Sequence, residues 1–215
     1  VTLTVSDNSG ADRVDVTIAA SGTGGGVDWN LDVDEDGSTF TNWTGVAGTW
    51  SSTGTVIQNT DTAAANKHAR YNTALPLGFP FIVEADLQIT GGSGSDRNAG
   101  LLFLYDGATD PPTGAAMVVL KGDSSSGTQV RCFRANQETI LEQSQSFTYN
   151  TWYTLRVVCN GRTFSVYLDG AFLLTAGGAN IASQGNQGYV GLATYGASAE
   201  WRNIKTWTLS TGTPA

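Results

Sequence analysis

Apolar and polar residues alternate in short segments along most of the chain, and this two-residue period indicates β-strands with one buried face. The alternation is strictest in the segment 81–89, where Val83, Ala85, Leu87 and Ile89 would share the buried face. Further strand-length segments lie at residues 99–105, 115–120, 129–135, 152–159, 162–168, 189–195 and 199–209. No segment shows the 3.6-residue apolar period of a helix. The pattern therefore predicts an all-β fold of two antiparallel sheets, because so many strands bury their faces only against one another.

One hairpin is predicted to the residue. Asn160-Gly161 is a strong signal for a two-residue type I′ turn, since both positions of that turn need positive φ. The turn would set Leu155 opposite Val166 on the buried face. It would likewise set Val157 opposite Phe164, so turn chemistry and hydrophobic pattern agree on one register.

The chain divides into four parts. Residues 1–20 hold two short alternating segments around a polar turn, and residues 21–26 form a Ser/Thr/Gly linker. Residues 27–210 carry the sandwich, and residues 211–215 a short tail. The first part resembles the last hairpin of a PKD-type immunoglobulin-like domain. Because the chain starts at Val1, we expect it to belong to a longer protein with attached neighbouring domains.

Composition narrows the functions that are possible. The net charge is −8, and residues 1–36 contain eight acidic residues against Arg13. An acidic chain without a basic stripe is poorly suited to nucleic acid or to an anionic membrane, so neither is an expected partner. One histidine and two cysteines exclude the usual zinc sites of one chain. No apolar run approaches the length of a membrane-spanning helix.

Six pieces of sequence, in order, resemble a concanavalin A-like (laminin G-like) jelly roll. They are the segments 40–50, 81–86, 97–103, 152–170, 188–192 and 201–204, for example Arg97-Asn98-Ala99-Gly100-Leu101-Leu102-Phe103. The resemblance implies the jelly-roll sandwich. It leaves the activity open, because this superfamily includes lectins, carbohydrate-binding modules, family 16 glucanases, polysaccharide lyases and keto-disaccharide hydrolases.

The catalytic carboxylates of the glucanases are incomplete here. Their pattern is Glu-x-Asp-x-x-Glu, and this chain has Glu84 and Asp86 but Ile89 at the third position. Lyases of this fold typically use Tyr and His, and His68 admits that chemistry. An enzyme centred on Glu84, Asp86 and His68 is therefore the alternative to a non-catalytic module.

Sugar binding needs an open surface with aromatic faces and planar polar groups. The candidates are polar residues on the solvated face of residues 81–89, together with arginines and aromatic residues at strand ends. This composition resembles family 66 carbohydrate-binding modules. The predicted ligand-binding residues are Glu84, Asp86, Arg97, Tyr105, Arg131, Arg134, Tyr195 and Trp201.

Two further sites are predicted. Asp32, Asp34 and Asp36, followed by Gly37, match the first half of an EF-hand loop, but position 12 is Trp43 instead of Glu. A structural Ca²⁺ ion and a solvated acidic turn both remain open. Cys132 and Cys159 lie in predicted strands and would form a disulfide if those strands are neighbours. Otherwise they are separate buried thiols.

These observations predict a non-catalytic carbohydrate-binding module of a secreted, multidomain bacterial protein. It would bind a polysaccharide, or the end of its chain, on a concave sheet, and would be a monomer. A polysaccharide-degrading lyase or keto-sugar hydrolase, and a laminin G-like adhesive module that binds protein, are the alternatives.

Overall fold

The computed structural model describes residues 29–75, 80–92, 96–105, 115–123, 127–134, 139–160, 163–177 and 188–209. Within these ranges, side chains 123, 127–129, 131–134, 139 and 140 are not described. The predicted hairpin, linker and tail at residues 1–26 and 211–215 lie outside the described residues. The described part contains strands and no helix, and so none long and apolar enough to cross a membrane.

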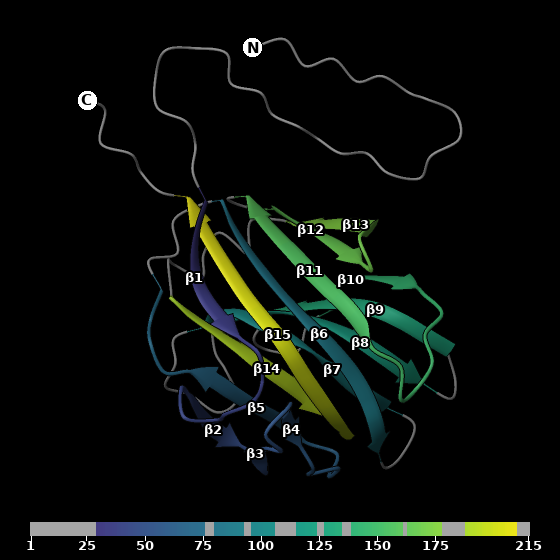
Figure 1. The fold of residues 1–215 in the computed structure, drawn as a ribbon. Coiled ribbons are helices and arrows are strands. Elements are labelled where there is room, and N and C mark those ends of the chain that lie inside the picture. Colours follow the sequence, from purple (N-terminus) through teal and green to yellow (C-terminus); the bar gives the residue numbers. More distant parts are fainter. Residues whose placement is uncertain are drawn as a thin grey trace, which may run out of the picture.

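The strands form two antiparallel sheets, as predicted (Figure 1). The 8-stranded sheet has the order β13 (Ala171–Gly177), β12 (Thr163–Leu168), β11 (Tyr153–Asn160), β6 (Phe81–Gly92), β15 (Ala197–Leu209), β4 (Ile57–Asn59) and β3 (Trp50–Ser52), with β1 (Trp29–Glu35) also paired to β15. The 7-stranded sheet has the order β10 (Thr139–Ser144), β9 (Gly127–Arg134), β8 (Ala116–Asp123), β7 (Asp96–Tyr105), β14 (Tyr189–Tyr195), β5 (Asn66–Tyr71) and β2 (Trp43–Ala47). Trp29 pairs with Leu209, so the described chain begins and ends at the same end of the molecule.

The core lies between the sheets and is centred on β6. Val83, Ala85, Leu87 and Ile89 are at most 2% exposed, which confirms the predicted buried face. They join one cluster with the inward residues of the other sheet, including Phe103 of β7. Strict alternation on β6 therefore fixes which residues face the core and which face outward.

The hairpin of β11 and β12 forms as predicted, but its register is wrong by two residues. Val157 pairs with Val166 and Leu155 with Leu168, because Asn160 is itself paired, with Thr163. The strands are therefore joined one residue later than Asn160-Gly161 predicts. Since a slip of two residues keeps every side chain on its own face, the buried face survives the error.

Replacing Leu87 by Ala should lower the free energy of unfolding by about 2–5 kcal/mol, because it opens a cavity at a fully buried site. The matched control is Gln88→Ala, the next residue of β6, which faces outward and donates a hydrogen bond to Glu200. Gln88→Ala should lower the free energy of unfolding by about 1 kcal/mol or less. Urea denaturation of both variants tests this, and equal losses would contradict the assigned faces.

Candidate functional site

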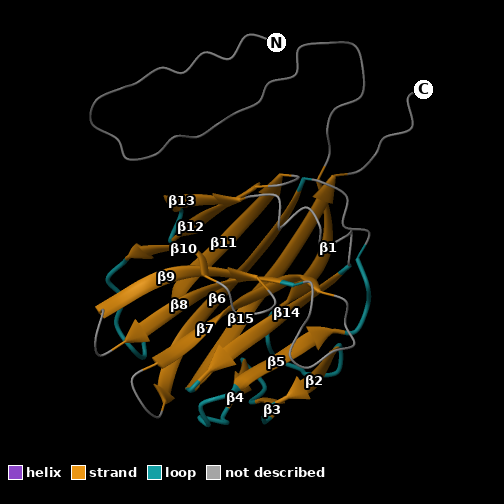
Figure 2. Cartoon of the chain, turned by 180° about the vertical axis from the view of Figure 1, so that it is seen from behind, coloured by secondary structure: helices purple, strands orange, loops and turns teal. Residues whose placement is uncertain are grey.

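Each sheet presents one outer face to the surroundings. We call the outer face of the 8-stranded sheet the back face and that of the 7-stranded sheet the front face. Figure 1 looks onto the strands of the back face, and Figure 2 shows the molecule from the other side, with β5, β14, β7 and β8 nearer. Because the core separates the faces, residues on one cannot share a ligand with residues on the other.

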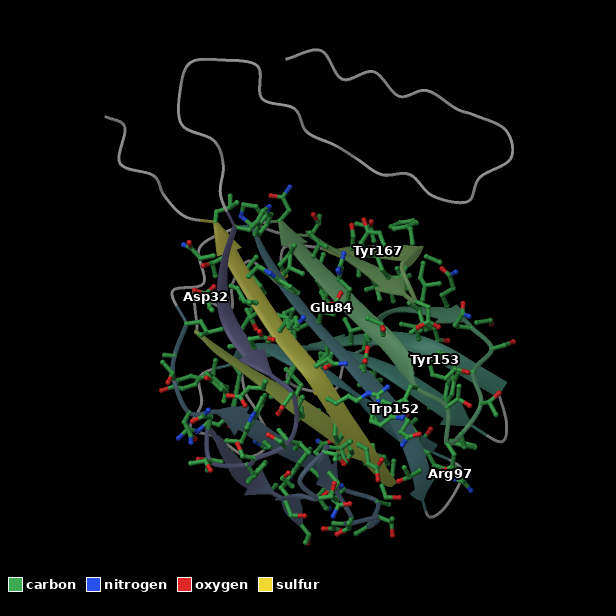
Figure 3. The ribbon with its side chains drawn as sticks, in the orientation of Figure 1. Asp32, Glu84, Arg97, Trp152, Tyr153 and Tyr167 are labelled. Carbon is green, nitrogen blue, oxygen red and sulfur yellow. The ribbon has the colours of Figure 1, made fainter. Side chains whose placement is uncertain are left out.

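Glu84 lies on the back face, in the middle of a row of alternating charges (Figure 3). Arg156 of β11 and Lys205 of β15 flank it in register. The guanidinium of Arg156 donates a hydrogen bond to the Glu84 carboxylate, and Lys205 Nζ lies 3.9 Å from Asp34 Oδ1. Glu84 does face outward from β6, as predicted, but its carboxylate is already paired and only 16% exposed.

The Asp86 carboxylate has partners on both of its oxygens. Thr154 Oγ1 donates to one carboxylate oxygen at 2.6 Å and Asn203 Nδ2 to the other at 2.7 Å. Arg202 Nε lies 3.5 Å from the second oxygen, and its guanidinium lies 4.2 Å from the ring centroid of Trp152. The expectation that Glu84 and Asp86 offer free polar groups to a saccharide is therefore wrong. Both carboxylates tie neighbouring strands of the back face together.

The other predicted ligand residues are scattered. Trp201 is fully buried in the core, with its ring 5.4 Å from that of Trp50, so it cannot stack on a sugar. Arg97 lies at the start of β7, far from Glu84 in Figure 3, and its guanidinium lies 5.2 Å from the ring of Tyr149. The side chains of Arg131 and Arg134 lie outside the described residues. The register pairs Arg131 with Val119 and Arg134 with Ala116 on β8.

The front face carries a buried hydrogen-bonded pair of titratable groups. His68 Nε2 of β5 lies 3.1 Å from the Tyr105 hydroxyl of β7, with the rings edge to face. β14 runs between these strands and pairs Ala193 with His68 and Tyr189 with Tyr105. Both rings are at most 1% exposed. Tyr105 is therefore not the exposed stacking residue that the sequence predicts.

A row of polar residues crosses the same face beside this pair. The register aligns Asn66 of β5, Tyr195 of β14, Asn98 of β7 and Lys121 of β8, and we call these four residues the polar row. The first three are half-buried, whereas Lys121 is buried and lies 2.6 Å from Asp96. Asn98 Oδ1 is buried and has no hydrogen-bond partner in the described part of the protein. Of these four residues, only Tyr195 was among the ligand-binding residues predicted from the sequence. The other three become its neighbours only through the strand register.

The predicted calcium ligands do not converge. A β-bulge between Leu31 and Val33 turns Asp32 toward Thr208, whose hydroxyl donates to it at 2.7 Å. Asp34 lies beside Lys205, and hydrogen bonds from Ser38 lower the pKa of the Asp36 carboxyl. The described residues contain no group of three metal-ligating side chains close enough to hold an ion. The three carboxylates therefore do not fit a calcium site.

The predicted disulfide is not formed. β9 and β11, which carry Cys132 and Cys159, belong to different sheets, and Cys159 is a free, buried cysteine. It lies on the inner face with Val157 and Phe164. Burial raises the pKa of the Cys159 thiol to about 12, so the neutral thiol acts as a small apolar side chain.

Comparison with known sequences decides the family. A sequence profile described as the 3-keto-alpha-glucoside-1,2-lyase-like domain matches residues 29–206, nearly all of the described sandwich. The chain belongs to this family. The match spans both sheets from β1 into β15, so the 3-keto-alpha-glucoside-1,2-lyase-like domain includes the front face, the back face and the core. A search of curated proteins finds no match.

Solved structures show the fold that this lyase-like domain shares. The carbohydrate-binding module CBM66 from Bacillus subtilis is 22% identical, with a TM-score of 0.61 over 78% of this chain and 96% of that chain. Lectin II from Ulex europaeus is 13% identical, with a TM-score of 0.60 over 84% and 99%. A putative glycosyl hydrolase from Parabacteroides distasonis is 17% identical, with a TM-score of 0.56 over 83% and 98%. These likenesses confirm the concanavalin A-like jelly roll.

Cys159 should resist alkylation while the lyase-like domain is folded. With a pKa of about 12, roughly one thiol in ten thousand is ionised at pH 8, and the thiolate is the reactive form. In a Cys132→Ser variant, which leaves Cys159 as the one thiol, mass spectrometry should find no modification by iodoacetamide in native buffer. The same variant in guanidinium should be modified completely. Rapid alkylation in native buffer would show that Cys159 is accessible.

Proposed function

We propose that this domain binds carbohydrate through the polar row of the front face. The observation that carries the proposal is the neighbourhood of Tyr195 and Asn98 on paired strands. Tyr195 offers the half-buried face or edge of an aromatic ring, and the half-buried amides of Asn66 and Asn98 flank it on the neighbouring strands. A sugar ring presents C–H groups to the first and hydroxyl groups to the second.

The two outer faces differ in the hydrogen-bonding side chains that a ligand could use. On the back face, Glu84 and Asp86 already accept hydrogen bonds from side chains of neighbouring strands. A ligand hydroxyl would have to displace these partners, and the displaced groups would be left unpaired. On the front face, the half-buried amides of Asn66 and Asn98 flank Tyr195. We therefore assign polar binding to the front face.

The likeness to a carbohydrate-binding module and to lectins supports this function over that of a protein-binding adhesive module. We propose that the ligand is a polysaccharide or the end of its chain. We further propose that the domain works without chemistry, as a monomer within a secreted, multidomain bacterial protein that it holds near its substrate.

Tyr195→Ala should weaken glycan binding at least about tenfold, because loss of one central aromatic contact costs about 1.4 kcal/mol or more. Tyr167→Ala is the matched control, since Tyr167 is a half-buried tyrosine on the back face. A glycan array would identify the ligand, and calorimetry would then compare both variants with the unaltered chain. Equal binding by Tyr195→Ala, or a loss confined to Tyr167→Ala, would contradict the assignment to the front face.

A second candidate function is catalysis, and the His68–Tyr105 hydrogen bond favours it. The family is described as lyase-like, and elimination next to a keto group requires a base. The imidazole of His68 could act as this base. It is hydrogen-bonded to the Tyr105 phenol and lies on the same face as the polar row. The alternative site of Glu84, Asp86 and His68 is wrong, because His68 lies on the front face and the two carboxylates lie on the back face.

If the domain is catalytic, it should convert a 3-keto-α-glucoside, and His68→Asn should abolish turnover while Tyr105→Phe lowers it. Product formation followed by chromatography measures both effects, and thermal unfolding controls for loss of fold at this buried pair. Absence of turnover by the unaltered chain, together with retained glycan binding, would leave the non-catalytic function alone.

A further inference from the structure

The side chains of the back face change from charged to apolar at the end where the described chain begins and ends. Below this end its rows are charged, as around Glu84. At this end, four adjacent strands carry an apolar row that the register aligns as Leu31, Trp207, Ile82 and Val158. Trp29, paired with Leu209, extends the row outward. We call these six residues the terminal strip.

The terminal strip is open to solvent in the described structure. Leu31 is 48% and Trp29 is 42% exposed, and the other four members are half-buried. Among the described strands, β1 has one partner, β15, so the strip reaches an edge of the sheet. A contiguous apolar surface of this kind marks an interaction site in a soluble protein.

The sequence preceding Trp29 has the complementary property. Residues 1–20 contain two segments in which every second residue is apolar: Val1, Leu3 and Val5, then Val14, Val16 and Ile18. An alternating segment of this kind has one apolar face, and packing against another apolar surface would stabilise it.

The connection keeps these residues near the strip. Only residues 21–28 separate these two segments from Trp29, and they span at most about 29 Å when fully extended. A short linker of this kind gives an effective concentration in the millimolar range, so even weak apolar contacts are populated. A second copy of the chain would have to reach the same surface at its own, much lower, concentration.

We propose that residues 1–20 dock on the terminal strip with their apolar positions against Trp29, Leu31 and Trp207. The docked segment covers the end of the back face and fixes the direction in which the chain enters the sandwich. It makes no contact with the front face, so this inference is independent of the proposed sugar binding.

Hydrogen exchange of the full chain, followed by mass spectrometry, tests the docking. Peptides from residues 1–20 should exchange at least tenfold more slowly than an unstructured peptide of the same sequence. Leu31→Asp, on the strip, should remove this protection. Phe172→Asp is the matched control, because Phe172 is an apolar residue 57% exposed on the same sheet but on β13, outside the strip. It should leave the protection unchanged.

A second variant keeps the test valid if Leu31→Asp does not fold. Val16→Asp lies in the docking segment and alters no described residue, and it should abolish the protection as Leu31→Asp does. The proposal is overturned if residues 1–20 exchange at the unstructured rate in the unaltered chain. It is also overturned if both Asp variants keep the protection, which would mean that the segment folds without the strip. Dimerisation in sedimentation that Leu31→Asp abolishes would assign the strip to a second copy instead.

Discussion

The whole arrangement depends on the burial of one side of β6 against the 7-stranded sheet. β6 lies between β11 and β15, and five of its side chains are almost fully buried. Once this face is fixed, the intervening residues Glu84 and Asp86 must point to the back face. Two packed sheets are about 10 Å apart, so their outer faces are separated by the whole thickness of the core. Every functional group of the domain is therefore assigned to one face or the other.

This constraint explains which parts of the fold could be predicted from the sequence. The buried face of a strand can be recognised from the local sequence, because every second residue is apolar. The inward residues of β6 and the long strands were therefore predicted correctly. The short strand β3, by contrast, has only three residues and no readable period. The hairpin shows the limit of local rules: Asn160-Gly161 predicted the turn, yet Asn160 pairs with Thr163. Hydrophobic contacts decided the register, and they permitted only a slip that kept each side chain on its face.

The site could be predicted much less well, because it depends on partners distant in the sequence. Asp86 is recognisable as an outward acid, but its hydrogen bond from Asn203 joins residues 117 positions apart. The sequence likewise does not show that Tyr195 and Asn98 are neighbours, whereas the pairing of β14 with β7 does. The acidic run at residues 32–36 shows the same dependence on distant partners. A bulge and the side chains of β15 direct Asp32 and Asp34 to different partners, and a spacing rule for a calcium loop contains neither.

The distribution of unsatisfied groups connects the two proposals. The charge pairs of the back face contribute little stability, since Arg156 and Arg202 are more than two-fifths exposed and such pairs are worth about 0–1 kcal/mol. Their stronger effect is on binding, because the carboxylates of Glu84 and Asp86 already accept hydrogen bonds from neighbouring strands. Both proposals therefore place binding elsewhere, on the polar row of the front face and on the terminal strip. Because these two regions lie on opposite sides of the core, a segment docked on the strip leaves the polar row open to a ligand.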